Sequence, residues 1–469
     1  MEFRRPEMYS KTMMLPGRGI PPAASLKKGV MNMKRAFAII LSAAMAVGAV
    51  AGFTVTAQAE EKVTVRILTR YSNPDNAREK YFMDKVAQFQ EENPDIDLQD
   101  VSISDEESHD TLFKTSVAAS DPIEVFNFLG YAANLDYVQN GVITDISGEL
   151  EADPEWGASY IDALFAPVDY SAFGVDGIYG MPTPPYGVCC FYNAKIFEEL
   201  GIEMPESWEA IEAAAPAIIE AGYIPMAFGA KDNYRAGHFL TALSMKMYGS
   251  DLNNALISGE KKWNDPEMLG LVQQMQDWYE AGLFGDNNLA YDANGELAKL
   301  EGEEAAIIFS GSWNIGTING ASNISDIVCK GFPYFESKPE FKDAWMGGPD
   351  DFMSMSSQPG DPDYDATLRV LKFFTSDDYY LGLYEALGGA GTYPINFEKT
   401  IEADALTTEF NDYYSVATDM IGEIEQFSPM TSLMDLVRTE VTTIFSGDSA
   451  EDIVNRIQDE VDYYNDSNA

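Results

Sequence analysis

The chain has 469 residues, 46% of them hydrophobic, and a formal net charge of −46 at pH 7. This length and composition suffice for the cores of roughly two or three domains, which excludes a chain that is disordered throughout. The 76 acidic residues far outnumber the 30 basic ones. The negative electrostatic field of such a chain repels nucleic acid and anionic membrane surfaces. Dense acidity more often keeps a protein soluble than it marks a cationic partner, so no nucleic-acid partner is expected.

The N-terminal region has the three parts of a secretory signal peptide. Lys34 and Arg35 precede an almost uninterrupted apolar run over residues 36–53, and an Ala-Gln-Ala sequence ends at Ala59. This pattern predicts export and cleavage after Ala59, so residues 1–59 are excluded from the fold. A retained membrane anchor is the alternative, but the polar residues that follow Ala59 favour cleavage. Beyond residue 59 no segment approaches the roughly 20 apolar residues of a bilayer span.

The start of the chain and its cysteines refine this expectation. The first 30 residues carry proline, glycine and scattered charge, so we expect the true start at Met31 or Met33. No cysteine lies at the predicted cleavage site, so a lipoprotein anchor is not expected. Cys189, Cys190 and Cys329 are too few for a disulfide framework. The first two could form a strained vicinal bridge, but an apolar strand around them favours small buried thiols.

From residue 63 onward, strand and helix patterns alternate along the chain. Residues 63–68 alternate in polarity and then become apolar, as in a strand that enters a sheet core. A helix follows from Pro74, with Phe82, Val86 and Phe89 on one apolar face. Further expected elements are a strand over 96–104, a helix over 110–120 and a strand over 123–128. This alternation favours an α/β fold with parallel sheets.

The sequence gives little support to a catalytic site or a metal site. His109 and His238 are the only histidines, too few for His-rich metal sites or most Ser-His-Asp arrangements. Carboxylates are so numerous that some pairs must lie at glycosidase distance by chance. Residues 361–365 open like a calcium loop without its glycine and final glutamate, and residues 388–391 lack the Lys-Ser/Thr of a phosphate loop. We therefore expect no catalytic residue, no metal site and no cofactor.

Residues 179–209 carry the most informative motif. Tyr192-Asn193 ends an apolar strand, and a short helix and a Pro-x-Ser-Trp helix start follow. This order resembles the crossover segment of family 1 extracellular solute-binding proteins, the sugar-specific capture subunits of ABC importers. Ser207 can cap the helix that begins there, so Trp208 is assigned to structure rather than to a ligand.

The resemblance covers essentially the whole chain beyond residue 59 and implies its fold. That fold is α/β and two-lobed, of the periplasmic-binding-protein type II, with a mostly parallel sheet flanked by helices in each lobe and a cleft between the lobes. Breaks rich in proline and glycine at 181–187, 347–351 and 388–394 suit three crossings between lobes. The expected bounds are 60–187 plus 353–390 for the N-terminal lobe and 188–352 plus 391–469 for the C-terminal lobe.

The same resemblance implies a function. The protein is expected to be an exported, monomeric ABC-transporter subunit of the cell envelope or exterior, without enzymatic activity. It would capture a carbohydrate, with many aromatic residues favouring an oligosaccharide, and deliver it to permease subunits in the membrane. Its lobes would close around the sugar by hinge motion. A secreted glycoside hydrolase and a surface lectin-like module are the alternatives, and recovery of the ligand unchanged would exclude the hydrolase.

Sugars offer flat C–H faces and a rim of hydroxyls, so their sites need aromatic platforms and hydrogen-bonding side chains. The apolar segment 304–310 leads into Gly311-Ser312-Trp313, which is similar to the family's Gly-x-Trp signature. That resemblance implies that Trp313 stacks on the ligand, with a core tryptophan as the alternative. Tyr186 falls where maltose-binding proteins place a ligand contact, although they have Glu there. The other candidates lie in loops after predicted strands or in the second crossover, and are Tyr71, Asn127, Tyr131, Asp232, Tyr234, Arg235 and Asp350.

Overall fold

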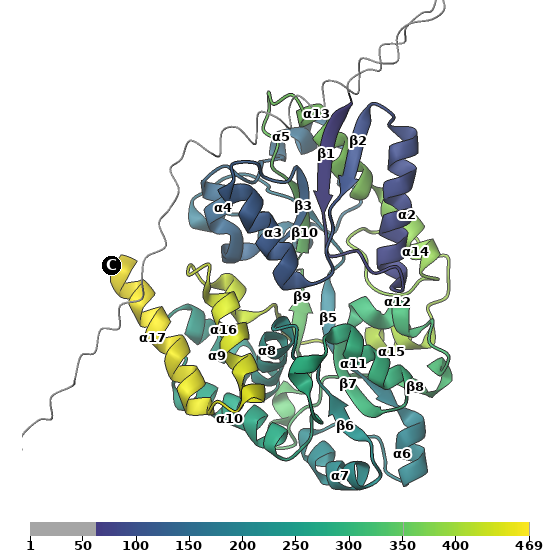
Figure 1. Cartoon of the computed structure of the whole chain (residues 1–469), viewed down its shortest axis with the longest axis vertical. Coiled ribbons are helices and arrows are strands. Elements are labelled where there is room, and N and C mark those ends of the chain that lie inside the picture. The colour runs from purple at the N-terminus through teal and green to yellow at the C-terminus, as the bar shows by residue number, and fades with distance from the viewer. Residues whose placement is uncertain (1–61, 350, 469) are drawn as a thin grey trace, which may run out of the picture. The chain divides into compact units, whose positions relative to one another are not determined.

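Two β-sheets organise the chain, and helices flank both of them (Figure 1). The structure is a computed structural model that describes residues 62–349 and 351–468. The predicted signal peptide, its cleavage site after Ala59 and the alternative start residues lie outside the described residues. Within the described part of the chain, no helix is both long enough and apolar enough to cross a membrane.

The first sheet combines N-terminal strands with one strand that returns late in the chain. Its strands are β1 (Val63–Leu68), β2 (Ile96–Asp100), β3 (Val125–Leu129), β4 (Met181–Pro182) and β10 (Asp351–Met355), in the order β2-β1-β3-β10-β4. Its helices include α2 (Ala77–Glu92), α3 (Glu106–Ala118), α4 (Leu135–Gln139), α5 (Ser147–Ala152), α13 (Tyr364–Phe374) and α14 (Asp377–Ala386). We call this sheet and its helices the first lobe.

The second sheet is built from the middle of the chain. Its strands are β5 (Tyr186–Asn193), β6 (Ile224–Ala227), β7 (Ala305–Gly311), β8 (Ile327–Gly331), β9 (Ala344–Gly348) and β11 (Asp419–Ile421), with the order β11-β9-β5-β7-β6 and β8 also paired to β5. Its helices include α6 (Ala194–Leu200), α7 (Trp208–Glu220), α8 (Tyr234–Tyr248), α9 (Ser250–Ile257), α10 (Pro266–Glu280), α11 (Ala293–Glu301), α12 (Ile315–Ile318), α15 (Ala405–Tyr414), α16 (Leu433–Thr442) and α17 (Ala450–Asn468). We call this sheet and its helices the second lobe.

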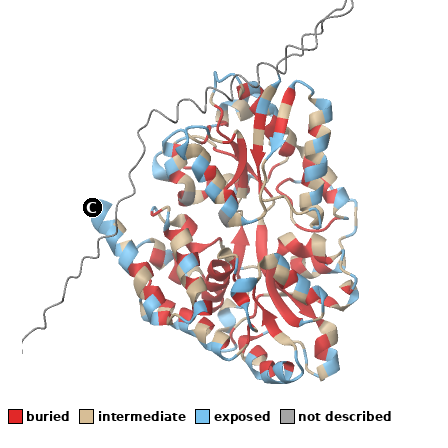
Figure 2. Cartoon of the chain, viewed as in Figure 1, coloured by how far each residue is buried: buried red, intermediate tan, exposed pale blue. Residues whose placement is uncertain are grey.

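Local sequence chemistry explains the start of the first lobe. Asn76 caps α2 by accepting hydrogen bonds from the backbone amides of Arg78 and Glu79. Phe82 and Phe89 are the buried residues of this helix, which confirms the apolar face predicted there. Both sheets are largely buried, whereas the outer faces of the helices are exposed (Figure 2). The helices therefore shield the sheets from water, as an α/β fold requires.

The predicted second strand is shorter than expected. Strand β2 ends at Asp100 rather than at Ser104, although the amides of Val101 and Ile103 still donate to the carbonyls of Ile67 and Thr69 at 2.9 and 3.0 Å, and serine hydroxyls join the pairing beyond that point. The hydroxyl oxygen of Ser102 accepts a hydrogen bond from the amide of Thr69 at 3.0 Å, and Ser104 shares a contact of 2.7 Å with Ser72. Side-chain hydrogen bonds of this kind compete with regular backbone pairing.

Three passages of chain join the two lobes. β4 ends at Pro182 and β5 begins at Tyr186, while β9 ends at Gly348 and β10 begins at Asp351. The third passage runs from α14 to α15, which packs against β8. These passages coincide with the three breaks rich in proline and glycine that the sequence contains, while the lobe boundaries of the sequence analysis stay a prediction.

The α/β class is confirmed, but both sheets are mixed rather than mostly parallel. Strands β1 and β3 run toward the passages, whereas β10 runs away from them and pairs with β3 antiparallel, with Asp351 opposite Leu129. In the second lobe β5 runs away from its passage and is antiparallel to β7, β8 and β9. A strand that has just crossed between lobes begins at the edge where its neighbours end. That entry point forces the antiparallel pairing.

The three cysteines are buried and unpaired, so Cys189 and Cys190 form no vicinal bridge. Both lie in β5, where their neighbours in the sheet are β7 and β8. Burial raises the pKa of the Cys189 and Cys190 thiols well above the usual range. They therefore act as small apolar side chains in the sheet, as the sequence analysis favoured.

Trp208 anchors an aromatic cluster in the second lobe and is fully buried, in agreement with its predicted structural role. Its ring stacks on Trp278 with 4.1 Å between centroids, and Phe332 and Phe239 approach its edge at 5.3 and 5.6 Å. The hydroxyl of Ser207 accepts a hydrogen bond from the amide of Ala210 at 3.2 Å, which caps α7 as expected.

Replacing Trp208 by alanine should leave a large void in this cluster. We expect Trp208→Ala to lower the free energy of unfolding by about 3–5 kcal/mol, the usual cost of such a truncation in a core. Urea denaturation followed by far-ultraviolet circular dichroism measures this change. As a control, Tyr463→Ala on the exposed face of α17, where the side chain is 71% exposed, should change it by less than about 0.5 kcal/mol. Equal effects of the two variants would contradict this view of the core.

Candidate functional site

A cavity of about 240 Å³, called the main cavity below, lies where strands of both lobes end. Tyr71 follows β1 and Thr183 follows β4 in the first lobe. Tyr186 begins β5 and Trp313 follows β7 in the second lobe. Strand ends bring distant segments to one edge, which is where α/β folds place their ligand sites.

Aromatic rings form the wall of the main cavity on the second lobe. Tyr186 stacks on His238 with 5.8 Å between ring centroids and an angle of 17° between the ring planes. Trp313 lies 6.0 Å from Tyr186, and Tyr234 lies 5.1 Å from His238, measured in the same way. The four rings come from β5, α8 and the segment after β7. They present a broad apolar surface to whatever occupies the cavity.

The position of Trp313 depends on a glycine. After β7 the chain enters a short 3₁₀ helix, Ser312–Asn314, which carries the indole back across the end of its own strand. A Cβ atom on Gly311 would lie only 2.1 Å from the Trp313 ring. Any larger residue at position 311 must therefore displace the indole.

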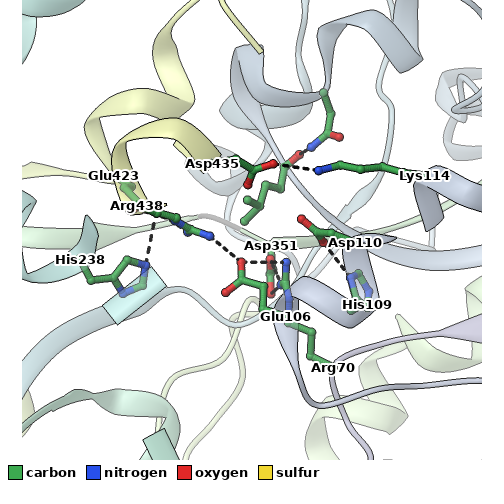
Figure 3. Close-up of polar contacts among 12 residues, drawn as sticks. Arg70, Glu106, His109, Asp110, Lys114, His238, Asp351, Glu423, Asp435 and Arg438 are labelled. Carbon is green, nitrogen blue, oxygen red and sulfur yellow. Dashed lines mark hydrogen bonds and ion pairs between the residues drawn. The ribbon is translucent and has the colours of Figure 1, made fainter. Parts of the chain in front are cut away.

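A row of alternating charges crosses from one lobe to the other beside this wall (Figure 3). Arg70 of the first lobe donates from one nitrogen to both carboxylate oxygens of Asp351, each at 2.8 Å, and its other nitrogen lies 3.5 Å from Glu106. Arg438 on α16 of the second lobe donates to the same Glu106 at 2.8 Å and also to Glu423. We call these five residues the charge row. It is the buried polar connection between the lobes.

Glu106 and His238 carry different charges within this environment. Burial by itself would raise the pKa of Glu106, but Arg438 and Arg70 outweigh burial and hold that pKa at about 2. Burial, with the positive charge of Arg438, lowers the pKa of His238 well below its usual value. His238 is therefore neutral at pH 7, and its contact of 3.6 Å with Glu423 is not an ion pair.

Further polar groups line the main cavity on both sides. Glu79 accepts hydrogen bonds from the amides of Ser72 and Asn73 at 2.8 and 2.7 Å, and Asp232 accepts one from the amide of Ala293 at 2.9 Å. Burial raises the pKa of both carboxyl groups. These carboxylates are fixed in place by backbone groups, and their remaining lone pairs can accept hydrogen bonds from a ligand.

Among the predicted site residues, five line the main cavity: Tyr71, Tyr186, Asp232, Tyr234 and Trp313. Their contact with a ligand stays a prediction. Asp350 lies outside the described residues. The remaining three, Asn127, Tyr131 and Arg235, do not line the main cavity.

Arg235 points away from the main cavity. It is 1% exposed, pairs with Glu296 at 2.9 Å and also donates to the carbonyl of Phe309. Tyr234 and Arg235 begin α8, and successive residues of a helix point about 100° apart, so only Tyr234 faces the cavity. The sequence predicts both residues in one loop at the site, and for Arg235 that prediction is wrong.

Asn127 and Tyr131 follow the third strand as predicted but do not line the main cavity. Asn127 lines a second cavity, of about 270 Å³, that shares Arg70 and Leu129 with the main cavity. Tyr131 has a positive φ of 60° and places its ring 4.3 Å from that of Phe427 in the second lobe. Both residues therefore lie near the junction of the lobes.

Sequence reasoning missed the charged members of the site. Arg70, Arg78, Glu106, Asp351 and Arg438 all line the main cavity. They come from segments far apart in the chain, and none belongs to a motif. In a chain with 76 acidic residues, the sequence does not indicate which carboxylate belongs to the site, because only the fold shows which cation each one pairs with. Within the described residues, no group of three or more His, Cys, Asp or Glu side chains is arranged to hold a metal ion.

Comparison with known protein sequences identifies relatives that are extracellular binding proteins. A family described as bacterial extracellular solute-binding protein matches residues 73–335. An ABC transporter extracellular-binding protein of Pyrococcus horikoshii is 22% identical over 324 residues, which cover 64% of this chain and 71% of that protein. The multiple sugar-binding protein of Streptococcus mutans is 22% identical over 287 residues, which cover 58% of this chain and 63% of that protein.

Solved structures share the fold. A chitin oligosaccharide binding protein superposes with a TM-score of 0.75 at 21% identity, covering 86% of this chain and 99% of the other. The solute-binding protein RafE in complex with raffinose gives a TM-score of 0.65 at 19% identity, covering 85% and 98%. These similarities confirm the two-lobed fold of the periplasmic-binding-protein type II.

The charge row makes a prediction about pH. Because the pKa of Glu106 is lowered from 4.5 to about 2, its ionised form stabilises the fold fully above about pH 5, and this stabilisation is lost as the pH falls toward 2. Glu106→Gln should lower the free energy of unfolding at pH 7 by up to about 3 kcal/mol, and the difference from wild type should shrink between pH 5 and pH 3. Urea denaturation at several pH values measures it.

The control for this experiment is Glu460→Gln on the exposed face of α17. This variant should follow the wild type at every pH. A wild-type advantage over Glu106→Gln that stays constant from pH 7 to pH 3 would contradict the role given to the ionised carboxylate.

Proposed function

Because the chain belongs to the family of bacterial extracellular solute-binding proteins, we propose that it captures a carbohydrate and delivers it to an ABC permease. The family consists of binding proteins, and its extracellular character agrees with the predicted export signal. The proposal adds what family membership leaves open: the class of ligand, the residues that hold it and the absence of chemical conversion. We propose a monomer as the functional form.

The aromatic wall beside fixed hydrogen-bonding groups is the observation that carries the proposal. A sugar ring has an apolar C–H face that packs on an indole or phenol, and a rim of hydroxyls that donate and accept. The main cavity offers Trp313 and Tyr186 for the face, and Glu79, Asp232 and Arg78 for the rim. Nonpolar solutes would leave these polar groups unsatisfied, and small ions would not use the aromatic wall.

An oligosaccharide is the favoured ligand. The structural relatives include a chitin oligosaccharide binding protein and sugar-binding proteins in complex with stachyose and raffinose, and the Streptococcus mutans relative is named for multiple sugars. The main cavity in this chain is lined by both lobes and runs along four aromatic rings. That extent suits more than one sugar ring.

Ligand capture is proposed to work by lobe closure about the three passages. We propose lobes close to 60–187 plus 353–390 and 188–352 plus 391–469, with the divisions placed between β4 and β5 and between β9 and β10, because β4 and β10 lie in one sheet and β5 and β9 in the other. A sugar that contacts both lobes at once binds the closed arrangement better than the open one. Only such a difference in affinity shifts the equilibrium toward closure.

We propose that the sugar is released unchanged, because the chain belongs to a family of binding proteins. Two of the cavity carboxylates, Glu106 and Asp351, are held in ion pairs with arginine. A hydrolase needs one carboxyl group available as an acid and a second as a base or nucleophile. The lectin-like alternative differs in having no permease partner.

The aromatic wall is tested through Trp313. Trp313→Ala should weaken binding of the best ligand at least about 30-fold, because a buried aromatic contact of this kind contributes about 2 kcal/mol or more. Calorimetric titration with mono-, di- and oligosaccharides of glucose, galactose, xylose and N-acetylglucosamine measures this loss. Chromatography of the sugar recovered after the titration reports whether it is unchanged, and turnover would refute the proposal.

A second variant displaces the indole of Trp313 without removing it. Gly311→Ala should displace the Trp313 ring and weaken binding about tenfold or more, while φ of −164° at position 311 accepts alanine without strain. The thermal melt of the ligand-free protein should change little, which separates this effect from unfolding. Tyr463→Ala serves as the control that leaves binding unchanged. Wild-type affinity in Gly311→Ala would show that the ligand does not use the indole.

A further inference from the structure

Three arginines line the main cavity, and two of them are paired with carboxylates. Arg70 pairs with Asp351 at 2.8 Å, and Arg438 pairs with Glu106 at the same distance. The third, Arg78, forms no ion pair in the part of the chain that the structure describes. Acidic residues outnumber basic ones by 76 to 30 in this chain, so a cavity cation without a carboxylate partner is an exception that requires an explanation.

Glu79 follows Arg78 in the chain but does not neutralise it. Oε2 of Glu79 accepts hydrogen bonds from the amides of Ser72 and Asn73 at 2.8 and 2.7 Å. The hydroxyl of Ser104 donates to the same oxygen at 3.0 Å. Successive residues of a helix point about 100° apart, so the two side chains leave α2 in different directions. The carboxylate is bound by first-lobe loops, and the guanidinium remains without an acidic partner.

Tyrosine rings lie around the guanidinium of Arg78 instead. Burial raises the pKa of Tyr71, Tyr380 and Tyr393, and the positive charge of Arg78 opposes this rise in all three. Nη2 of Arg78 also lies beside the third passage, where a Cβ atom on Gly391 would come within 3.3 Å of it. Aromatic rings exclude water, so an ion pair formed beside them is stronger than one in bulk solvent.

The guanidinium of Arg78 is open to the main cavity. The residue is partly exposed, and Nε is its only side-chain nitrogen that is buried without a hydrogen-bond partner. The terminal nitrogens carry N–H donors in a planar fork that matches the two oxygens of a carboxylate. Arg78 also lies in the first turn of α2, where the partial positive charge of the helix end adds to the attraction for an anion.

The other charges of the main cavity limit its ligand to a single negative charge. Glu106 and Asp351 are balanced by their arginines. Glu79 and Asp232 also line the cavity, and although burial raises the pKa of both, neither has a cation to balance it when ionised. These two groups repel a phosphate monoester, which carries nearly two charges. One carboxylate, in contrast, matches the one charge of Arg78.

From these observations we propose that the captured carbohydrate is acidic and contains a hexuronic acid unit, whose carboxylate pairs with the guanidinium of Arg78. This inference rests on the proposed function, because it assigns a charged group to a sugar held in the main cavity. It specifies the chemical class of the ligand, which family membership leaves open. A sulfate ester on a sugar carries the same single charge, and the titration distinguishes the two anions.

The first measurement compares uronic acids with their neutral methyl esters on the wild-type protein. Calorimetric titration is carried out with D-galacturonic, D-glucuronic and D-mannuronic acid, with their oligosaccharides, and with the methyl ester of each. An ester keeps the ring and its hydroxyls and loses only the charge. We expect at least one acid to bind about 30-fold more tightly than its ester, because a hydrogen-bonded ion pair is lost, and to weaken as NaCl is added. Equal binding of acid and ester throughout would overturn the proposal.

The second measurement changes Arg78 itself. Arg78→Gln removes the charge and keeps a polar side chain, so it should weaken binding of the acid about 30-fold and of its ester less than about threefold. Arg78→Lys keeps the charge without the planar fork and should recover part of the affinity for the acid. A merely structural role of Arg78 would weaken acid and ester alike, and that result would also refute the pairing.

Lys80, two residues further along α2, supplies the matched control. It is an exposed cation that pairs with Asp84 and lines neither cavity. Lys80→Gln removes the same charge from the same helix and should leave the affinity for both acid and ester unchanged. A loss equal to that of Arg78→Gln would show that the net charge of the lobe, rather than a direct contact, attracts the acid.

The outcomes separate this inference from the proposed function. A neutral oligosaccharide that binds tightly and responds to Trp313→Ala, with no acid preferred over its ester, refutes the acidic ligand alone. Failure of every sugar to bind, acidic or neutral, refutes carbohydrate capture itself. Tighter binding of D-galactose 6-sulfate or D-glucose 6-phosphate than of every uronic acid refutes the carboxylate. If the thermal melt shows that Arg78→Gln is unfolded, the comparison of acid and ester on the wild type decides.

Discussion

Arg438 connects the two lobes through buried carboxylates, and the site depends on this connection. It donates to Glu423 within its own lobe and to Glu106 in the other, and Glu106 also neighbours Arg70. Removing one partner from such a buried group leaves an uncompensated charge, which is far more costly than losing an exposed ion pair. The charge row therefore specifies how the lobes meet, and one of its members, Arg70, lines both cavities.

The chemistry of each cavity follows from what the charge row leaves unsatisfied. On one side, the aromatic rings of the second lobe face carboxylates that backbone amides hold in place, and the result is a surface suited to a sugar ring. The second cavity shares Arg70 with the main cavity, and there Lys114 on α3 pairs with Asp435 on α16 at 2.9 Å.

Several particular residues show how far the sequence could be interpreted alone. Trp208 and Trp313 lie in similar apolar contexts, yet the sequence separated them, because Ser207 before the first is a helix cap and Gly311 before the second ends a strand. The sequence predicts Arg235 in a loop together with Tyr234, whereas α8 begins at Tyr234 and turns the side chain of Arg235 into the core. Successive residues of a helix point about 100° apart, so a loop mistaken for a helix start misplaces the second side chain.

The sequence by itself determined the class of fold and the family, and it predicted the breaks between lobes and the aromatic platform. These features depend on local patterns, such as alternation, turn residues and a Gly-x-Trp motif, that are legible within ten or twenty residues. Only the tertiary structure decided the direction of the crossing strands, the charge row and the second cavity. Glu106 and Arg438 are 332 residues apart, and pairing at that separation is set by how the lobes pack. No local sequence pattern predicts this pairing, because each charged residue lies far along the chain from its partner.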